Sequence, residues 1–382
     1  MNITRPSIRV CEHADRHYHA RRQNHRAITM SNDFSRVQDA VASIEAGGFA
    51  VVVDDEDREN EGDLIIAAEA ATQQNMAFMI RHTSGVICAP CEPARLDALA
   101  LPPMVERNQE LHRCTFTVSV DYLPGMTTGI SALERARTLN ALADPDTGAG
   151  DFIRPGHIFP LKYQPGGVLV RSGHTEAALD LCRLAGRRPA AALCELVNDD
   201  GTMQRVPDLL RFAEAHDLPI ISIDALIRYR ARHDVLVEEV AATPMQLHGE
   251  PLDVHVYRTV FDDKQITAVV KGSIDGERPT LVRVVKGDPH RDFLASAVAP
   301  DNVISRSLKM IAQAPQGVFI YLPAAGSEED ETPGAVWREV GLGSYVLNAL
   351  GVRRIHLLAS RELTFPGIAS FGLSIETIIK EF

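Results

Sequence analysis

The feature that most constrains this chain is a run of acidic residues between two apolar segments. Seven carboxylates and one arginine, Arg58, occupy the ten residues Asp54–Asp63, between FAVVV at 49–53 and LIIAA at 64–68. The flanking segments are continuous in aliphatic residues, which predicts two buried strands. An isolated acidic run is usually a solvated loop, but here strands at both ends would hold the mutually repelling carboxylates close together. The pattern therefore favours a site for a hard cation, with Arg58 placed to pair with an anion.

A second motif has the composition of a phosphate-binding turn. Residues 166–175, GGVLVRSGHT, combine glycines, a strand-like VLV and a turn into a helix. We expect Thr175 to cap this helix, which continues through EAALDLCRLAG and ends at Gly186. Backbone amides at a helix start, together with Arg171 and a hydroxyl, can bind a phosphate group. His174 would lie beside this group as a metal ligand or a base.

Two more segments carry single polar residues in unusual places. Glu195 lies in the otherwise apolar ALCELV at 192–197, where we expect a strand, and a buried carboxylate there needs a partner or a proton. His157 lies in RPGHIFPL at 154–161, where the Pro-Gly pair predicts a turn. Taken alone, each residue has a structural explanation, as a buried acid or a turn histidine. Only the combination with the first two motifs indicates a site.

In this order the four motifs resemble 3,4-dihydroxy-2-butanone 4-phosphate synthase, an enzyme of riboflavin biosynthesis. The resemblance extends from about Asp33 to Arg230 and includes TTGIS at 127–131. It has one visible departure: the family usually has Asp-Arg after the TTGIS segment, where this chain has Glu134 and Arg135. We expect the longer carboxylate to alter spacing more than chemistry.

The resemblance implies an activity and a role for each motif residue. The activity is conversion of D-ribulose 5-phosphate to 3,4-dihydroxy-2-butanone 4-phosphate and formate, with magnesium, or alternatively manganese, assisting enolisation and rearrangement. Glu59 and His174 would be the two protein ligands of the metal. His157 and Glu195 would be the catalytic groups for proton transfer. The implied substrate-binding residues are Arg58, Glu59, Asp63, Arg171, Ser172, Gly173, His174, Thr175 and Glu195.

Beyond Arg230 the pattern of the chain changes. Residues 233–248 are expected to be a linker that carries a proline, and strands then alternate with helices. We therefore expect an α+β synthase domain at 31–232, followed by a smaller α/β GTP cyclohydrolase II-like domain at 249–382. Every residue assigned to substrate or metal lies in the first domain, so that domain is expected to suffice for the synthase reaction. The segments that resemble GTP cyclohydrolase II, which is commonly fused behind this synthase, are TLVRV (280–284), GVFIYLP (317–323) and REVGLGSYVLNALGVRRIHLLA (338–359).

The second domain is expected to be inactive as a cyclohydrolase and to bind no zinc. The cyclohydrolase family holds zinc with three cysteines, and no cysteine follows Cys194 in this chain. The acidic segment PAAGSEEDE at 323–331 replaces a glycine- and arginine-rich one and would repel a triphosphate. Arg338 remains where the family has its proposed nucleophile. Two alternatives stay open: a bifunctional enzyme with working GTP cyclohydrolase II activity, or a C-terminal module for dimerisation or ligand sensing.

Composition bounds the partners and the location of the protein. A formal net charge of −12 and an isoelectric point near 5.6 argue against a nucleic-acid binder or a protein of anionic membrane surfaces. No apolar run reaches membrane-spanning length, and the six cysteines do not form a secreted disulfide framework. We expect a cytoplasmic enzyme that acts on a small sugar phosphate, and the resemblance implies a homodimer. Residues 1–30 are expected to be a disordered extension or to precede the true start at Met30.

Overall fold

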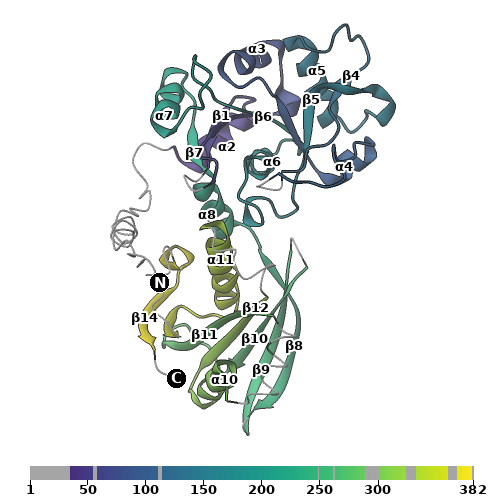
Figure 1. Ribbon diagram of the computed structural model, residues 1–382. Coiled ribbons are helices and arrows are strands. Elements are labelled where there is room, and N and C mark those ends of the chain that lie inside the picture. Colours follow the sequence, from purple (N-terminus) through teal and green to yellow (C-terminus); the bar gives the residue numbers. More distant parts are fainter. Residues whose placement is uncertain are drawn as a thin grey trace, which may run out of the picture.

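The computed structural model describes residues 35–54, 58–110, 114–247, 249–260, 263–288, 292, 301–323, 333–359 and 368–380. The N-terminal extension expected at 1–30 and the residues 324–331 of the acidic segment lie outside these ranges. In the described part of the chain, two lobes are each built on one seven-stranded sheet with helices packed on it (Figure 1). The expected two-domain arrangement is therefore present.

The first sheet contains the acidic segment between two of its strands. Its strands are β1 (Ala50–Val53), β2 (Gly62–Ala67), β3 (Cys88–Cys91), β4 (Val120–Tyr122), β5 (Phe152–Lys162), β6 (Ala191–Glu195) and β7 (Ile220–Ser222). They lie in the order β4-β5-β3-β6-β2-β1-β7. The β1–β7 and β3–β5 pairs are parallel and the others antiparallel. The prediction of two buried strands around the acidic run is confirmed, because every residue of β1 and β2 is buried.

Helices cover both faces of this sheet, which explains its continuous apolar strands. The helices are α2 (Val37–Glu45), α3 (Gln73–His82), α4 (Pro93–Ala98), α5 (Ala132–Ala143), α6 (His174–Leu184), α7 (Val206–Ala215) and α8 (Ile223–His233), with 3₁₀ turns η1 (Ala68–Ala70), η2 (Ala149–Asp151) and η3 (Gly167–Leu169). Val52 and Ile65 share a core with α2, α6 and α8. Val51 and Leu64, which point to the opposite face, share a core with α3, α5 and α7.

The second sheet begins earlier in the chain than the sequence pattern suggested. Its strands are β8 (Val237–Leu247), β9 (Glu250–Thr259), β10 (Gln265–Lys271), β11 (Thr280–Gly287), β12 (Gly317–Pro323), β13 (Arg354–Leu358) and β14 (Ser374–Ile379), in the order β14-β13-β11-β12-β10-β9-β8. The linker expected at 233–248 is wrong, because β8 pairs with β9 along its whole length. Pro244 indicated a linker, but β8 is an edge strand, and an edge strand tolerates proline. The helical elements of this lobe are α10 (Val303–Gln313), α11 (Pro333–Ala349) and η4 (Ile368–Phe371).

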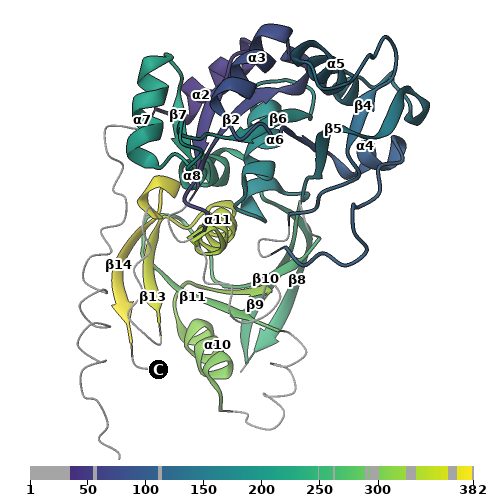
Figure 2. The same cartoon turned by 45° about the horizontal axis from the view of Figure 1, so that its top comes forward.

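The two lobes share an apolar core, in which α11 packs against α8 (Figures 1 and 2). Leu342 of α11 belongs to the same buried cluster as Ile227 of α8. Gly341 permits close contact between the helices: a Cβ atom at this position would lie 3.3 Å from the Cβ of Ala231 and 3.4 Å from Cδ1 of Leu236. The second lobe is therefore packed onto the first by a helix–helix contact. Among the described residues, no helix is both long and apolar enough to cross a membrane.

Candidate active site

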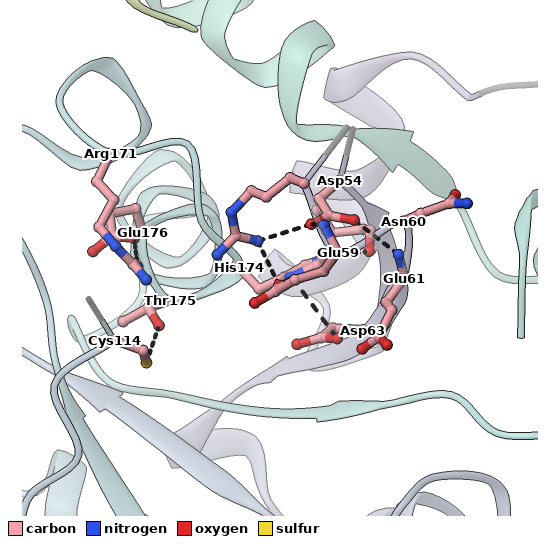
Figure 3. Close-up of polar contacts among 12 residues, drawn as sticks. Asp54, Glu59, Asn60, Glu61, Asp63, Cys114, Arg171, His174, Thr175 and Glu176 are labelled. Carbon is pink, nitrogen blue, oxygen red and sulfur yellow. Dashed lines mark hydrogen bonds and ion pairs between the residues drawn. The ribbon is translucent and has the colours of Figure 1, made fainter. Parts of the chain in front are cut away.

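Asp54 organises the acidic connection between β1 and β2. Its carboxylate is buried, and Oδ2 accepts hydrogen bonds from Nη1 of Arg58 at 2.8 Å and from the amide of Glu59 at 3.1 Å. Oδ1 accepts from the amide of Glu61 at 2.8 Å. One side chain thus fixes both the backbone of the turn and its arginine (Figure 3). From the sequence, Asp54 was one of seven carboxylates and had no predicted role of its own, because nothing in the local sequence distinguishes it from its neighbours.

Side chains from this turn, from β2 and from the start of α6 converge on one point (Figure 3). Ligand atoms of Asp54, Glu59 and His174 all lie within 4.8 Å of one another. Nδ1 of His174 is 3.6 Å from Oε2 of Glu59 and 3.9 Å from Oδ1 of Asp63. Nε2 of His174 lies 3.2 Å from the carbonyl oxygen of Val52, which can only accept, so Nε2 carries a hydrogen and Nδ1 faces the carboxylates. The structure brings together both predicted metal ligands and adds Asp54.

These residues fit a divalent cation. Oδ1 of Asp63 is buried without a hydrogen-bond partner among the described residues, so part of its charge is not balanced by a donor. A hard cation takes carboxylate oxygens, and the orientation of His174 by the Val52 carbonyl is that of a metal-binding imidazole. A buried carboxylate oxygen that receives no hydrogen bond, beside two further acids and an oriented imidazole, is the donor set that a divalent ion needs.

The charges in this cluster are strongly coupled. Burial lowers the pKa of His174, but the Asp63 carboxylate and the hydrogen bond to Glu59 raise it more, to about 9. Burial raises the pKa of Asp63 to about 7, although His174 opposes the rise. Because a metal-bound imidazole must be neutral at the ligating nitrogen, cation binding here would release a proton from His174.

The predicted phosphate segment lies at the start of α6, next to the carboxylate cluster (Figure 3). Nη1 of Arg171 donates to Oε2 of Glu176 at 2.6 Å, and Oε1 of this buried acid accepts from the amide of Gln164 at 3.1 Å. A Cβ atom at Gly173 would lie 2.5 Å from Nη1 of Arg171 and 2.8 Å from Oε2 of Glu176, so glycine is needed for this approach. Ser172 between them is half-buried. Glu176 thus holds Arg171 against the helix N-terminus.

Two local predictions for this segment are wrong. Residues 168–170 do not form a strand: they belong to η3 and the turn after it, because Gly166 and Gly167 adopt φ angles of 96° and 65°, which interrupt extended backbone. The N-cap of α6 is Gly173, so α6 begins at His174 and Thr175 lies in its first turn. Oγ1 of Thr175 contacts Sγ of Cys114 at 3.8 Å.

Glu195 is the last residue of β6 and lies directly opposite Asp63 in the antiparallel β2–β6 pair. Side chains of directly opposed residues point to the same face of a sheet, so Glu195 lies beside the carboxylate cluster. Glu195 is half-buried, and its Oε2 accepts a hydrogen bond from Oγ of Ser84 at 2.7 Å. The strand register therefore unites two predicted site residues that are far apart in the sequence.

His157 lies within β5, so the prediction of a Pro-Gly turn is wrong. A Cβ atom at Gly156 would lie 2.0 Å from the carbonyl carbon of Val120 in β4, so this glycine allows close strand contact. Asp121 of β4, which is buried, places Oδ2 2.7 Å from Nδ1 of His157 and accepts from its amide through Oδ1 at 2.9 Å. A carboxylate at Nδ1 fixes the hydrogen there and leaves Nε2 on the 40% exposed ring for proton exchange. Asp121 was not predicted from the sequence, although an acid within the apolar VSVDY at 118–122 carries the same signal as Glu195.

The TTGIS segment supports this histidine and its carboxylate partner. A Cβ atom at Gly129 would lie 2.0 Å from Oδ2 of Asp121 and 2.9 Å from Nδ1 of His157. Glu134 accepts hydrogen bonds from the amide and hydroxyl of Thr127, at 2.5 and 2.8 Å, and from the hydroxyl of Ser131 at 2.8 Å. The bond from the Thr127 amide is the main reason that the pKa of Glu134 falls to about 2. Glu134, the residue that departs from the family pattern, therefore accepts the hydrogen bonds that hold the TTGIS turn next to His157.

His157 is not in direct contact with the carboxylate cluster. The order β5-β3-β6-β2 places its strand two positions from the strand of Glu195, which corresponds to about 10 Å at the usual strand spacing. A small substrate between them could be reached from both sides. In the second lobe, the described residues include no comparable group of histidines, cysteines and acids, and Arg338 lies in α11.

Two protein families match consecutive parts of the chain. The model of 3,4-dihydroxy-2-butanone 4-phosphate synthase matches residues 38–229, and that of GTP cyclohydrolase II matches residues 237–380. The second match begins where β8 begins, which agrees with the corrected start of the second sheet.

Several curated proteins are similar to this chain across both of its domains. The probable bifunctional riboflavin biosynthesis protein RIBA 1, chloroplastic, of Oryza sativa subsp. japonica is 42% identical over 370 residues, which are 90% of this chain and 69% of that protein. The monofunctional riboflavin biosynthesis protein RIBA 2, chloroplastic, of Arabidopsis thaliana is 40% identical over 365 residues, 90% of this chain and 76% of that protein. The riboflavin biosynthesis protein RibBA of Salinispora arenicola is 42% identical over 369 residues, 90% of this chain and 87% of that protein.

Solved structures give the same result. The chain is similar to RibBX, a two-domain 3,4-dihydroxy-2-butanone 4-phosphate synthase from A. baumannii, with 36% identity and a TM-score of 0.76 over 91% of this chain and all of that one. A 3,4-dihydroxy-2-butanone 4-phosphate synthase in complex with two magnesium ions covers 53% of this chain and 99% of its own, with 44% identity and a TM-score of 0.51. The chain therefore belongs to the 3,4-dihydroxy-2-butanone 4-phosphate synthase family of riboflavin biosynthesis enzymes, with a GTP cyclohydrolase II-type domain following the synthase domain.

Proposed function

We propose that this protein converts D-ribulose 5-phosphate to 3,4-dihydroxy-2-butanone 4-phosphate and formate. The observation that carries the proposal is the cluster of Asp54, Glu59, Asp63 and His174, in which a buried oxygen of Asp63 receives no hydrogen bond. The five-carbon substrate contains all the atoms of the four-carbon product and formate, so the reaction needs proton transfers and bond rearrangement but no oxidant. Acids and bases around one small substrate are sufficient for such chemistry.

Asp54, Glu59 and His174 would hold a divalent cation, magnesium or alternatively manganese. Bound there, the cation would polarise the carbonyl and hydroxyl oxygens of the substrate and so ease enolisation. A synthase 44% identical to this chain was solved in complex with two magnesium ions, which supports magnesium as the metal. Asp63, which lies against His174, would orient a substrate hydroxyl, and Arg58 would pair with the anionic end of the substrate or with the enolate.

Arg171 and the N-terminus of α6 would bind the phosphate. The first-turn amides of α6 have no intrahelical partners, and the ion pair with Glu176 already orders Arg171. Ser172 and the Thr175 hydroxyl would complete this group. Because Gly173 places the guanidinium directly over the helix start, the phosphate would meet a charge and several backbone donors together.

His157 and Glu195 would transfer protons from different sides of the substrate. Asp121 holds the hydrogen of His157 on Nδ1, so Nε2 would accept a proton from a carbon next to the carbonyl or return one. Glu195 would exchange protons with hydroxyl groups near Asp63. Two proton-transfer groups on separate strands allow one site to serve enolisation, loss of water and skeletal rearrangement in turn.

We further propose that the C-terminal domain does not open GTP and binds no zinc. Support comes from the lack of any cysteine after Cys194, since three thiolates hold the metal in active cyclohydrolases. A monofunctional relative and a two-domain synthase are both similar over about 90% of this chain. The competing proposal, a bifunctional enzyme, is favoured by the family match at 237–380 and by relatives named as bifunctional.

The remaining assignments are proposals on the same basis. We propose an α+β synthase domain at 31–232 and an α/β second domain that starts at 237 instead of 249. We also propose a cytoplasmic homodimer that acts on a sugar phosphate without nucleic-acid or membrane partners. Dimerisation or ligand sensing stays open as the role of the second domain.

One experiment tests both proposals. The purified full chain is incubated with magnesium and either D-ribulose 5-phosphate or GTP, and formate is measured with formate dehydrogenase. Formate is expected from the sugar phosphate alone, and EDTA should abolish its release. Glu59→Gln should remove most turnover, whereas Glu61→Gln, in the same turn but outside the ligand group, should retain it. Formate and pyrophosphate from GTP, with stoichiometric zinc in the protein, would establish the bifunctional alternative.

A further inference from the structure

Ser84 is bonded to the predicted catalytic acid at two points, and neither the sequence motifs nor the proposed function account for it. Its hydroxyl donates to Oε2 of Glu195 at 2.7 Å, and its amide donates to the carbonyl oxygen of Glu195 at 2.8 Å. Among the described residues, Oε1 of Glu195 has no hydrogen-bond or ion-pair partner. The two carboxylate oxygens of Glu195 are therefore not equivalent.

The turn that carries Ser84 is held from two helices. At the end of α3, the amide and hydroxyl of Thr83 donate to the carbonyl oxygen of Met79 at 3.1 and 2.6 Å. On the other side, the carbonyl oxygen of Gly85 accepts from Nη1 of Arg135, a buried arginine of α5, at 3.2 Å. Gly85 itself has a φ of +80°, which an L-residue rarely adopts. Ser84 is exposed, but its backbone is fixed on both sides.

The direction of the hydrogen bonds follows from the neighbouring thiol. Sγ of Cys194 lies 3.3 Å from Oγ of Ser84 and 3.8 Å from Oε2 of Glu195. Burial raises the pKa of Cys194 to about 11, so the thiol keeps its proton and can donate to the serine oxygen. The serine proton is then directed to the carboxylate, which is the strongest acceptor in reach. The hydroxyl of Ser84 and the thiol of Cys194 thus both lie beside Oε2 of Glu195, with the shorter bond from the serine.

We propose that Ser84 is a positioning residue that holds Oε2 of Glu195, so that Oε1 is the oxygen that exchanges a proton with the substrate. This inference rests on the proposed function. Without the serine hydroxyl, the carboxylate of Glu195 rotates among several positions, and only some of them direct an oxygen to the substrate. Ser84 contacts Glu195 and none of the groups assigned to metal or phosphate, which supply most of the charge that holds the substrate, so its effect falls more on turnover than on substrate affinity.

The test compares single substitutions in the full chain with magnesium. Ser84→Ala is expected to lower kcat for formate release about tenfold, the effect of losing one hydrogen bond to a charged group, with KM for D-ribulose 5-phosphate changed less than twofold. Ser84→Thr, which keeps the hydroxyl, should restore kcat to within threefold of the unchanged protein. The matched control is Ser43→Ala, which removes a serine hydroxyl bonded to the Phe49 carbonyl in the same domain and should leave kcat unchanged.

The outcomes separate a positioning role from a structural one. Tm is measured for every variant, because a fall in kcat that is caused by loss of folding would be accompanied by a fall in Tm. A kcat for Ser84→Ala equal to that of Ser43→Ala would overturn the inference, as would a Ser84→Thr variant as slow as Ser84→Ala while its Tm is unchanged. Absence of formate release by the unsubstituted chain would instead overturn the proposed function itself.

Discussion

Arg230 and Asp180 form a buried ion pair beneath the phosphate segment, and Arg230→Met should destabilise the protein strongly. The Asp180 side chain is fully buried and Arg230 is 15% exposed, with 2.7 Å between Nη1 and Oδ2. Asp180 also accepts from the amide of Val168 at 2.8 Å and from the hydroxyl of Tyr163 at 3.0 Å. Nη1 of Arg230 donates in addition to the carbonyl oxygen of Gly166 at 2.9 Å.

The magnitude follows from removing the nearer of two cations from a buried carboxylate, because Nη1 of Arg183 lies 3.9 Å from its other oxygen, Oδ1. Removing one partner of a buried pair costs about 3 to 5 kcal/mol, and the two donors that remain on Asp180 favour the lower end, about 3 kcal/mol. For a domain of about 200 residues this corresponds to a fall in Tm of roughly 6 to 12 °C. The Gly166–Val168 turn leads into Arg171, so KM for the sugar phosphate should rise as well.

The cost of Arg230→Met should depend on pH. Burial raises the pKa of Asp180, and the Arg230 guanidinium opposes the rise. Between the ordinary aspartate pKa of about 4 and the raised value, the folded protein binds more protons than the unfolded chain, so its stability falls as pH rises. Without Arg230 the folded-state pKa of Asp180 rises further. The loss of stability should therefore be small near pH 4 and increase toward neutral pH.

Thermal unfolding at several pH values measures this effect. The control is Arg211→Met, which removes an exposed arginine paired with Asp208 on α7 and should cost less than about 1 kcal/mol. Equal Tm values for Arg230→Met and Arg211→Met at pH 7 would refute the reasoning, because a fully buried carboxylate would then have lost its nearer cation without consequence. A loss that does not change between pH 5 and pH 8 would refute the charge-based explanation alone.

Four further outcomes are expected. Glu59→Gln should weaken magnesium binding, measured by calorimetry, and an unchanged affinity would remove Glu59 from the ligand set. Arg171→Ala should raise KM for ribulose 5-phosphate at least tenfold with a smaller change in kcat, since a charge-assisted bond to the phosphate is lost. Asp121→Asn should lower kcat about 100-fold at similar KM, because the amide no longer fixes the hydrogen of His157 on Nδ1; near-normal turnover would contradict the pairing. Residues 31–232 alone should release formate but unfold at a lower temperature than the full chain, because the face of α8 that α11 covers becomes exposed. A folded but inactive fragment would show that the second domain completes the site.

The sequence by itself determined where the strands around the acidic turn lie and which residues gather there. Continuous branched aliphatic residues are favourable only where both faces of a strand are covered, so the runs at 49–53 and 64–68 predicted β1 and β2 directly. The pairing of Glu59 with His174 was predicted from family resemblance, and the structure places their ligand atoms within 4.8 Å of each other and of Asp54. Strands of the second domain were also predicted from local pattern, but the expected alternation with helices is wrong for its first half, where β8, β9, β10 and β11 follow one another in the described part of the chain without a helix between them.

Only the tertiary structure decided which polar groups meet across the sheet. Asp121 and His157 are 36 positions apart, and Ser84 and Glu195 are 111 apart, so their contacts depend on strand order and register. The same holds for β8: Pro244 argues for a linker until the strand is known to lie at the edge of a sheet. Local patterns specify burial and periodicity, because these depend on neighbours in the chain. The partners of a buried polar group depend on what the whole fold brings within about 3 Å, and no short segment carries that information.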